Sequence, residues 1–447
     1  MSSVSFDAAF AALKKITDEF SELFSLKGVN EKMAQFSRGR FDWPALKMGD
    51  LTARVPVVQG GMGVGISLSR LASAVAQAGG VGVIAANAVG MLEPDYFKDG
   101  RAANLRALRK EIRAAREKTR GIIGVNIMVA VNDFWELLDV AIEEKADMVF
   151  MGAGLPIKNI PVEKMRAAGV KAVPIISSPR AVEMIFKMWK KIYNDVPDAV
   201  VFEGPKAGGH LGFSAEQIDD PAFQLEALVP AIAETIRPFE AEFGREIPLI
   251  AGGGVFTGED IQAVLELGAS AVQMGTRFVA TRECDADEAF KEAYVNSREE
   301  DIGLIQSPVG MPGRAIRNRF ITDSEAGLRP GFKCAWQCLA SCKAEKARYC
   351  ISIALNNARQ GRLTQGFVFA GTNAFRVEKI VSVAALVNEL AEGFRKAAGD
   401  KAASRVQVLV RELQELKRQY AGMRLRLGEL QAAVMERLDN SLGIPVL

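Results

Sequence analysis

Hydrophobic positions in the middle of this chain fall into short runs that are rich in β-branched residues and bounded by turn residues. Each run is followed by a stretch with apolar residues at helical spacing, such as Ser67–Ala78, Asp133–Glu144, Pro179–Lys190 and Gly258–Leu267. The runs predict strands at Val55–Gln59, Val81–Ala85, Ile122–Met128, Asp147–Met151, Lys171–Ile176, Asp198–Glu203, Ile247–Ala251 and Ser270–Gly275.

Strands that alternate with helices predict a parallel sheet, and eight such units in roughly 225 residues match the usual size of a closed barrel. We therefore expect an α/β fold, a (β/α)8 or TIM barrel, from about Val55 to Phe278. An open doubly wound sheet is the alternative. The uncharged stretch Leu71–Leu92 is long enough to cross a bilayer, but Gly79 and Gly80 divide it into a helix end and a strand.

Further segments flank this barrel. We expect a helical N-terminal extension over residues 1–50, a barrel domain with an inserted active-site segment over 51–325, a Cys-rich helical segment over 326–380, and a helical tail over 381–447. The tail has apolar residues at alternating spacings of three and four, which predicts a coiled-coil seam that joins copies of the chain. A long helix packed on its own barrel is the alternative. The seam positions are Val406, Leu409, Leu413, Leu416, Tyr420, Met423, Leu427, Leu430 and Val434.

The amino-acid composition of the chain limits the classes of binding partner that we expect. The chain has 447 residues, of which 49% are hydrophobic and 25% charged, and its 56 basic and 54 acidic side chains nearly balance. This predicts a soluble globular protein with no nucleic-acid or membrane partner. The N-terminus does not resemble a signal peptide, so we expect a cytoplasmic protein whose five cysteines form no disulfide framework.

Small residues follow nearly every predicted strand, and in such a barrel the ligand site lies where the strands end. Glycines there let backbone atoms approach a large flat ligand, although any single glycine can serve only a tight turn. The candidate ligand-binding residues are Gly60, Gly61, Met62, Asn87, Asn126, Gly208, Gly209, Gly252, Gly253, Gly254, Gly275 and Thr276.

The most specific of these residues are the triglycine 252–254 and the pair Gly275-Thr276. Barrels that bind phosphate commonly do so with the loops after the last two strands, where backbone N–H groups face the anion. Because the chain has no strong net charge, we assign the expected phosphate to a cofactor and not to a polyanionic substrate.

His210 is the only histidine of the chain and follows the sixth predicted strand in a Gly-Gly-His loop. An imidazole at this place can accept a proton from a weak carbon acid or donate one to a carbanion. A structural histidine is the alternative.

Five stretches together resemble a known family. They are VPVVQGGMGVGISLSRLASAVAQAGGVGVIAA, GVNIMV, VFEGPKAGGHLGF, IPLIAGGGVFTGEDIQAVLELGASAVQMGTRF and SPVGMPGRAIRN, within residues 55–318. The family is that of the nitronate monooxygenases, formerly called 2-nitropropane dioxygenases, whose superfamily includes the FMN-dependent enoyl-acyl-carrier-protein reductases. The last stretch resembles the reductase branch.

The resemblance implies an FMN-dependent oxidoreductase in which His210 is the active-site histidine. A nitronate monooxygenase would oxidise alkyl nitronates with O2, whereas a reductase would use NADH or NADPH to reduce an enoyl thioester. A flavin barrel that is only a scaffold is a third possibility. The resemblance also places the flavin ring near Gly61, Met62, Asn87 and Asn126, and the FMN phosphate at Gly253, Gly254, Gly275 and Thr276.

The sequence departs from this family in two places. Lys206 stands in the loop before His210, where the family leads us to expect an acidic residue. The second departure is a cluster of cysteines, whose i, i+4, i+8 spacing would align the first three along one helical face. These thiolates could hold an iron–sulfur cluster, or the thiols could pack as small hydrophobic side chains. The cluster comprises Cys334, Cys338, Cys342 and Cys350.

Overall fold

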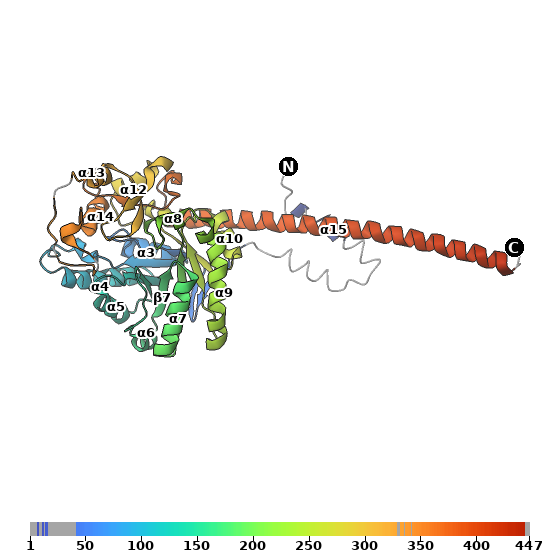
Figure 1. Cartoon of the computed structure of the whole chain (residues 1–447), viewed down its shortest axis with the longest axis horizontal. Helices are drawn as coiled ribbons and strands as arrows, with labels where there is room; N and C mark the ends of the chain where they lie inside the picture. Colours follow the sequence, from blue (N-terminus) through green and yellow to red (C-terminus); the bar gives the residue numbers. More distant parts are fainter. Residues whose placement is uncertain are drawn as a thin grey trace. The chain divides into compact units, whose positions relative to one another are not determined.

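The computed structural model contains a closed barrel of eight parallel strands, within the body at the left of Figure 1. It describes residues 42–442 except 329, 330, 335 and 341, together with 7–8, 11–12 and 14–16. The barrel strands are, in order, β3 (Val57–Gln59), β4 (Val81–Ala85), β5 (Ile122–Met128), β6 (Met148–Gly152), β7 (Lys171–Ile176), β8 (Val200–Glu203), β10 (Leu249–Gly252) and β11 (Ala271–Met274). The last strand pairs in parallel with the first, through Val272 opposite Val57, and closes the barrel.

The prediction of a (β/α)8 barrel is therefore confirmed, and the open sheet is excluded. The predicted strands β4, β5 and β7 have the observed bounds, and the others differ by one or two residues at their ends. The helices that follow the strands are α3 (Ser69–Gln77), α4 (Gly100–Lys118), α5 (Phe134–Glu143), α6 (Val162–Ala168), α7 (Pro179–Tyr193), α9 (Leu225–Phe243), α10 (Gly258–Glu266) and α11 (Thr276–Val279).

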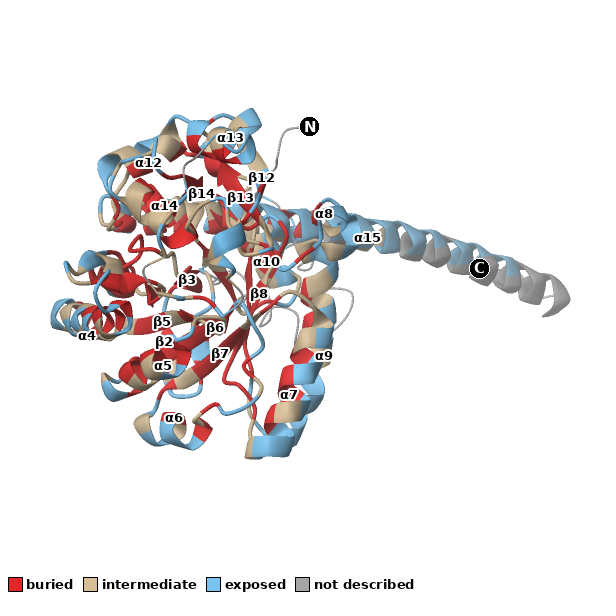
Figure 2. Ribbon diagram, turned by 60° about the vertical axis from the view of Figure 1, so that its left-hand side comes forward, coloured by how far each residue is buried: buried red, intermediate tan, exposed pale blue. Residues whose placement is uncertain are grey.

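Burial follows the layers of the barrel. Figure 2 shows the strands coloured as buried, whereas α7 and α9 have exposed outer faces. In α7 the four buried residues, Val182, Ile185, Phe186 and Trp189, recur at spacings of three, one and three, which is the stripe of an amphipathic helix. The apolar side chains that the strands turn inward form one core cluster.

The end of the barrel where the strands begin is closed by a hairpin of β1 (Leu46–Met48) and β2 (Leu51–Ala53). Leu46 and Met48 are fully buried in the core cluster of the barrel. The expected helical extension over residues 1–50 is thus wrong for residues 46–48, where alternating burial makes a strand. Residues 17–41 of that extension lie outside the described residues.

A second sheet lies beside the barrel and is formed by segments far apart in the sequence. The hairpin of β12 (Ile302–Gln306) and β13 (Pro312–Ile316) pairs with β14 (Val368–Phe369) and with β9 (Gly209–His210). The short helices around it are α8 (Ala215–Ile218), α12 (Glu288–Val295), α13 (Arg319–Glu325) and α14 (Ile351–Arg359). This sheet joins the loop after β8 to the C-terminal part of the chain.

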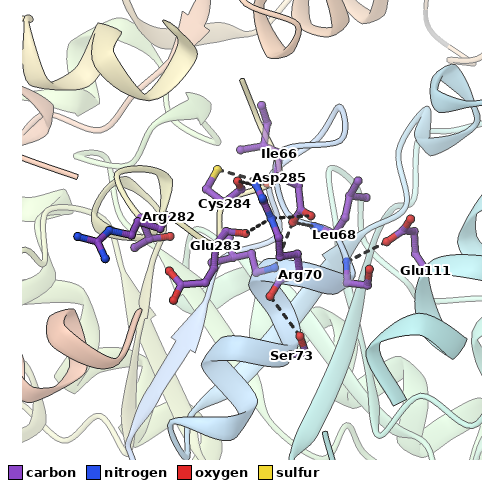
Figure 3. Close-up of polar contacts among 12 residues, drawn as sticks. Ile66, Leu68, Arg70, Ser73, Glu111, Arg282, Glu283, Cys284 and Asp285 are labelled. Carbon is purple, nitrogen blue, oxygen red and sulfur yellow. Dashed lines mark hydrogen bonds and ion pairs between the residues drawn. The ribbon is translucent and has the colours of Figure 1, made fainter. Parts of the chain in front are cut away.

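Helix α3 is held at its start by a polar network from the segment before α12 (Figure 3). The Asp285 carboxylate accepts hydrogen bonds from the backbone N–H groups of Leu68, at 2.8 Å, and Leu71, at 3.2 Å. The Arg70 side chain donates to the carbonyl oxygens of Glu283 and Cys284. These contacts fix the chain immediately after the glycine loop that follows β3.

The helix α15 (Val383–Leu442) agrees with the prediction of a long C-terminal helix. The chain divides into a larger compact unit, Trp43–Gly393, and a smaller one made of Met1–Asp42 and Phe394–Leu447. Side chains of the predicted seam at Leu409 and at positions 420, 423, 427, 430 and 434 lie outside the described residues. No described helix combines the length and apolar character needed to span a membrane.

Candidate active site

The residues predicted from the strand ends gather around one cavity of about 320 Å³ at the carboxyl ends of the barrel strands. Gly252 is the exception, because it is the last residue of β10, is paired with Glu203 and Gln273 on its two sides, and does not line the cavity. The predicted residues that do line it are Gly60, Gly61, Met62, Asn87, Asn126, Gly208, Gly209, His210, Gly253, Gly254, Gly275 and Thr276.

Gly61 is small for a reason that the sequence did not reveal. A Cβ atom on this residue would lie 2.3 Å from Cβ of Asn126. The absence of a side chain at Gly61 therefore makes room for Asn126 of β5 and not only for a ligand. The adjacent side chains are held by the backbone: Asn87 Oδ1 accepts a hydrogen bond from the Met128 N–H at 3.1 Å. The loop after β3 and the ends of β4 and β5 therefore form one packed wall.

The loops after β10 and β11 form a separate corner of the cavity. Gly253 and Gly254 have φ angles of +98° and +95°, which residues with side chains rarely adopt. Thr276 Oγ1 accepts the Gly371 N–H at 3.3 Å, so its own hydroxyl proton is available to a ligand. Asn373 Nδ2 donates to the Gly254 carbonyl at 2.6 Å. These contacts leave a concave corner lined by glycine backbone and a hydroxyl group.

Sequence reasoning did not identify the segment that contains Gly371 and Asn373. The sequence does contain a signal for this segment, because the apolar run Phe367–Ala370 is followed by the small or polar residues Gly371-Thr372-Asn373. The barrel strands are followed by small residues in the same way. The segment lies about a hundred residues beyond the last barrel strand, and the barrel pattern alone gives no reason to place it at the cavity.

His210 lines the cavity from β9, which pairs with β13 so that His210 lies opposite Gly313. Its Nε2 atom lies 2.7 Å from Oγ of Ser307, 97 residues further along the chain. The Phe369 ring packs edge-on against the imidazole, with ring centroids 5.1 Å apart. The orientation of the imidazole is thus set by two residues that the sequence did not identify as part of the site.

Arg314 holds the loop that leads to His210. This buried side chain donates through Nη1 to the carbonyl oxygens of Pro205, at 2.5 Å, and Ala207, at 2.8 Å. The bonds span more than a hundred residues, so no local spacing could predict them. Both Arg314 and Ser307 belong to the stretch SPVGMPGRAIRN. From the sequence alone, this stretch contributed only to the resemblance to the family.

Burial sets the charges of two titratable groups at the cavity. It lowers the pKa of His210 to about 4, so the imidazole is neutral at pH 7. It raises the pKa of Glu203, at the end of β8, to about 7. A neutral imidazole has one donor and one acceptor nitrogen, and can therefore accept a proton or donate a hydrogen bond.

One side of the cavity wall is largely apolar and comes partly from residues 339–369. Such a wall favours a ligand with an alkyl or acyl part, because apolar surface is removed from water on binding. The apolar residues on this side are Met128, Val131, Leu339, Ile351, Leu355 and Phe369.

The first three clustered cysteines do not share a helical face, and that prediction is wrong. Cys334, Cys338 and Cys342 lie in non-helical backbone, and Cys350 is the residue before α14. They line a second cavity, of about 490 Å³, and all are free thiols. In the part of the chain that the structure describes, no three His, Cys, Asp or Glu side chains are grouped to hold a metal ion.

The iron–sulfur interpretation is therefore not supported. Burial raises the pKa of Cys338 to about 11, and Cys338 and Cys342 pack against a cluster of apolar side chains. These thiols act as small hydrophobic groups in the wall between the two cavities. Cys284, the fifth cysteine, is buried, and its thiol donates to the Ile66 carbonyl at 3.5 Å.

Known proteins resemble this chain in sequence and in fold. Residues 45–393 match the family model for nitronate monooxygenase. A probable nitronate monooxygenase of Staphylococcus aureus (strain Newman) is 27% identical over 311 residues, which cover 61% of this chain and 78% of that protein. The solved structure of FabK from Thermotoga maritima is 30% identical, with a TM-score of 0.59, and covers 76% of this chain and 93% of that one.

A nitroalkane oxidase from Streptomyces ansochromogenes has a similar fold, with a TM-score of 0.59 at 24% identity over 77% of this chain and 96% of that one. The family match extends from the hairpin that closes the barrel to the start of α15, and thus includes every segment that lines the cavity. The chain belongs to the nitronate monooxygenase family, a family of oxidoreductases that use flavin.

Proposed function

We propose that this protein is an FMN-dependent oxidoreductase that oxidises alkyl nitronates with O2. The observation that carries the proposal is His210, a neutral imidazole that lines the cavity and contacts Ser307 and Phe369. The family match over residues 45–393 and the 27% identity to a probable nitronate monooxygenase support the same reaction.

The glycine corner fits the phosphate of FMN. A Cβ on Gly254 would crowd the Lys206 side chain, and a Cβ on Gly275 would be in ordinary contact with Met62 Sδ, at 3.5 Å. Gly253, Gly254, Gly275 and Thr276 would hold the phosphate, because backbone N–H groups and a free hydroxyl are suitable donors to an anion. Bound FMN would supply the electron transfer and the reaction with oxygen.

The protein's own residues then bind and orient the substrate. The neutral His210 ring would take the α-proton of a nitroalkane, or donate a hydrogen bond to an oxygen of the nitronate. Ser307 would hold the imidazole in place and share its proton. The apolar wall that includes Leu339 and Ile351 would receive the alkyl part of the substrate and exclude water.

A second candidate reaction is the reduction of an enoyl thioester by NADH or NADPH. The 30% identity to FabK favours it, as does the hairpin of β12 and β13, which contacts His210 and contains the reductase-like stretch. In that reaction His210 would protonate the substrate carbon.

An absorption spectrum of the purified protein, followed by anaerobic addition of NADH, NADPH and an alkyl nitronate in turn, tests both candidates. Bleaching of the bound flavin by the nitronate alone supports nitronate oxidation, whereas rapid bleaching by a pyridine nucleotide supports the reductase. A colourless protein that does not bind added FMN would refute both.

A variant His210→Ala separates an enzyme from a flavin-binding scaffold. We expect turnover of the nitronate to fall at least about a hundredfold, since positioned acid–base groups commonly contribute that much. The flavin spectrum of the variant serves as the control for folding. Unchanged turnover with normal flavin content would contradict the proposed role of His210.

A further inference from the structure

Lys206 is the residue at which the sequence departs from its family, and the structure places it at the glycine corner. It lies in the loop after β8, and its carbonyl accepts hydrogen bonds from the N–H of Thr372, at 3.1 Å, and from its hydroxyl, at 3.2 Å. Arg314 binds the carbonyl oxygens on either side of it, at Pro205 and Ala207. The backbone of Lys206 is thus held from two sides.

The side chain of Lys206 passes over Gly254. A Cβ atom built on Gly254 would lie 3.1 Å from Lys206 Cδ and 3.2 Å from Lys206 Cβ. Both residues line the same cavity as Gly275 and Thr276. The absence of a side chain at Gly254 therefore makes room for the lysine stem, which lies against the glycine where the phosphate is expected.

Lys206 has no counter-ion among the described residues. Among the described residues that line the cavity, Lys206 is the one with a permanent positive charge, while Asp133 and Glu203 are acidic and His210 is neutral. No described carboxylate forms an ion pair with its ammonium group, and the residue is exposed. An ammonium group on a fixed backbone beside exposed amides is a suitable partner for a dianionic phosphate.

We propose that Lys206 pairs with the phosphate of bound FMN and makes this chain select FMN over flavins without a phosphate. The inference rests on the proposed use of FMN and concerns a residue that is particular to this chain. An acidic residue here would repel the phosphate, whereas lysine attracts it. The pair should weaken as salt rises, because it lies at the exposed edge of the cavity.

The test compares dissociation constants of FMN and riboflavin, which differ only in the phosphate, by flavin fluorescence on the flavin-free full-length protein. We expect Lys206→Met to raise the FMN constant about tenfold, the size of a partly exposed charged hydrogen bond, and to leave the riboflavin constant unchanged. Lys206→Glu should raise the FMN constant further. The variant Lys158→Met is the control, because Lys158 is an exposed residue after β6, at the same end of the barrel, and does not line the cavity.

Measurements at about 0.05 and 0.5 M salt add a second readout, since the FMN constant of the wild-type protein should rise with salt more than that of Lys206→Met. Equal losses of FMN and riboflavin affinity in Lys206→Met, or no loss at all, would overturn the inference while leaving the proposed function in place. A wild-type protein that binds neither flavin would overturn the cofactor assignment and this inference together.

Discussion

The carboxyl group of Glu203 lies at the end of β8 and faces the cavity without a hydrogen-bond partner among the described residues. Burial raises its pKa from an ordinary 4.5 to about 7, so the native fold favours the protonated form. Below pH 4.5 the folded and unfolded chains both bind the proton, and stability is unaffected. Between pH 4.5 and about 7 the unfolded chain loses this proton while the folded chain keeps it, so stability falls over this interval and stays at the lower value above it.

Glu203→Gln should therefore stabilise the flavin-free protein at pH 8 and leave it nearly unchanged at pH 4.5. A shift from 4.5 to about 7 corresponds to a gain on the order of 3 kcal/mol in the free energy of unfolding, since glutamine resembles the protonated acid. Urea denaturation of both proteins at the two pH values measures it. A gain that is equal at both pH values would contradict the raised pKa.

Arg314 is a second residue whose effect can be predicted, because its buried guanidinium satisfies two carbonyl oxygens in the loop before His210. Arg314→Met should lower the free energy of unfolding by about 2–4 kcal/mol, as two bonds from a charged donor are lost and buried acceptors are left unpaired. The matched control is Arg317→Met, which removes an exposed ion pair with Glu325 and an exposed hydrogen bond to the Leu304 carbonyl, and should cost about 1 kcal/mol or less. Equal losses in chemical denaturation would count against this role of Arg314.

At the scale of elements, two adjacent glycines after β3 offer a sharp comparison. Gly61→Ala would bring a Cβ within 2.3 Å of Asn126, whereas the nearest atom to a Cβ on Gly60 lies at 3.6 Å. We expect Gly61→Ala to separate the loop from the end of β5, with a loss of about 1–3 kcal/mol in stability and weaker flavin binding. Gly60→Ala should change both by much less. Thermal unfolding and flavin titration of the pair test this, and equal effects would refute the packing argument.

The sequence was sufficient to predict the barrel because its signal is local. Each strand is a short apolar run, and a strand such as Val81–Ala85 is buried at all five positions, so tertiary contacts agree with the pattern. The prediction of a helix for the cysteine segment was wrong because i, i+4 spacing is compatible with a helix but does not require one. Its backbone turns instead, and Cys338 contacts the side chain of Ser352 in the next helix.

The site was only partly predictable for a related reason. Glycines at strand ends indicate a ligand site. From the sequence, His210 and the glycine corner could therefore be placed at the same end of the barrel. Ser307 reaches His210, and Gly371 reaches the cavity, through pairing of β9 with β13 and of β13 with β14, which joins segments about 100 and about 50 residues apart. Such pairing depends on the assembled barrel and leaves no short-range pattern.

At the scale of the whole molecule, the larger compact unit, Trp43–Gly393, nearly coincides with the family match over 45–393. Every residue that lines the cavity belongs to this unit. The part of α15 beyond it is therefore not required to complete the site, and we expect it to serve association of copies of the chain, as its apolar spacing predicts.

Leu416 gives this expectation a physical basis, because its side chain is 55% exposed in the single chain although it lies on the predicted seam. Replacing Leu413 and Leu416 together with Glu would place like charges at a coiled-coil interface and remove apolar burial, so the dissociation constant of the oligomer should rise at least about a hundredfold. The control, Gln414→Glu with Gln419→Glu, adds the same charge at exposed positions off the seam. Light scattering with size-exclusion chromatography should then give a smaller mass for the seam variant alone, with nitronate turnover unchanged in both. Equal masses for wild type and seam variant would show that α15 does not join copies through this seam.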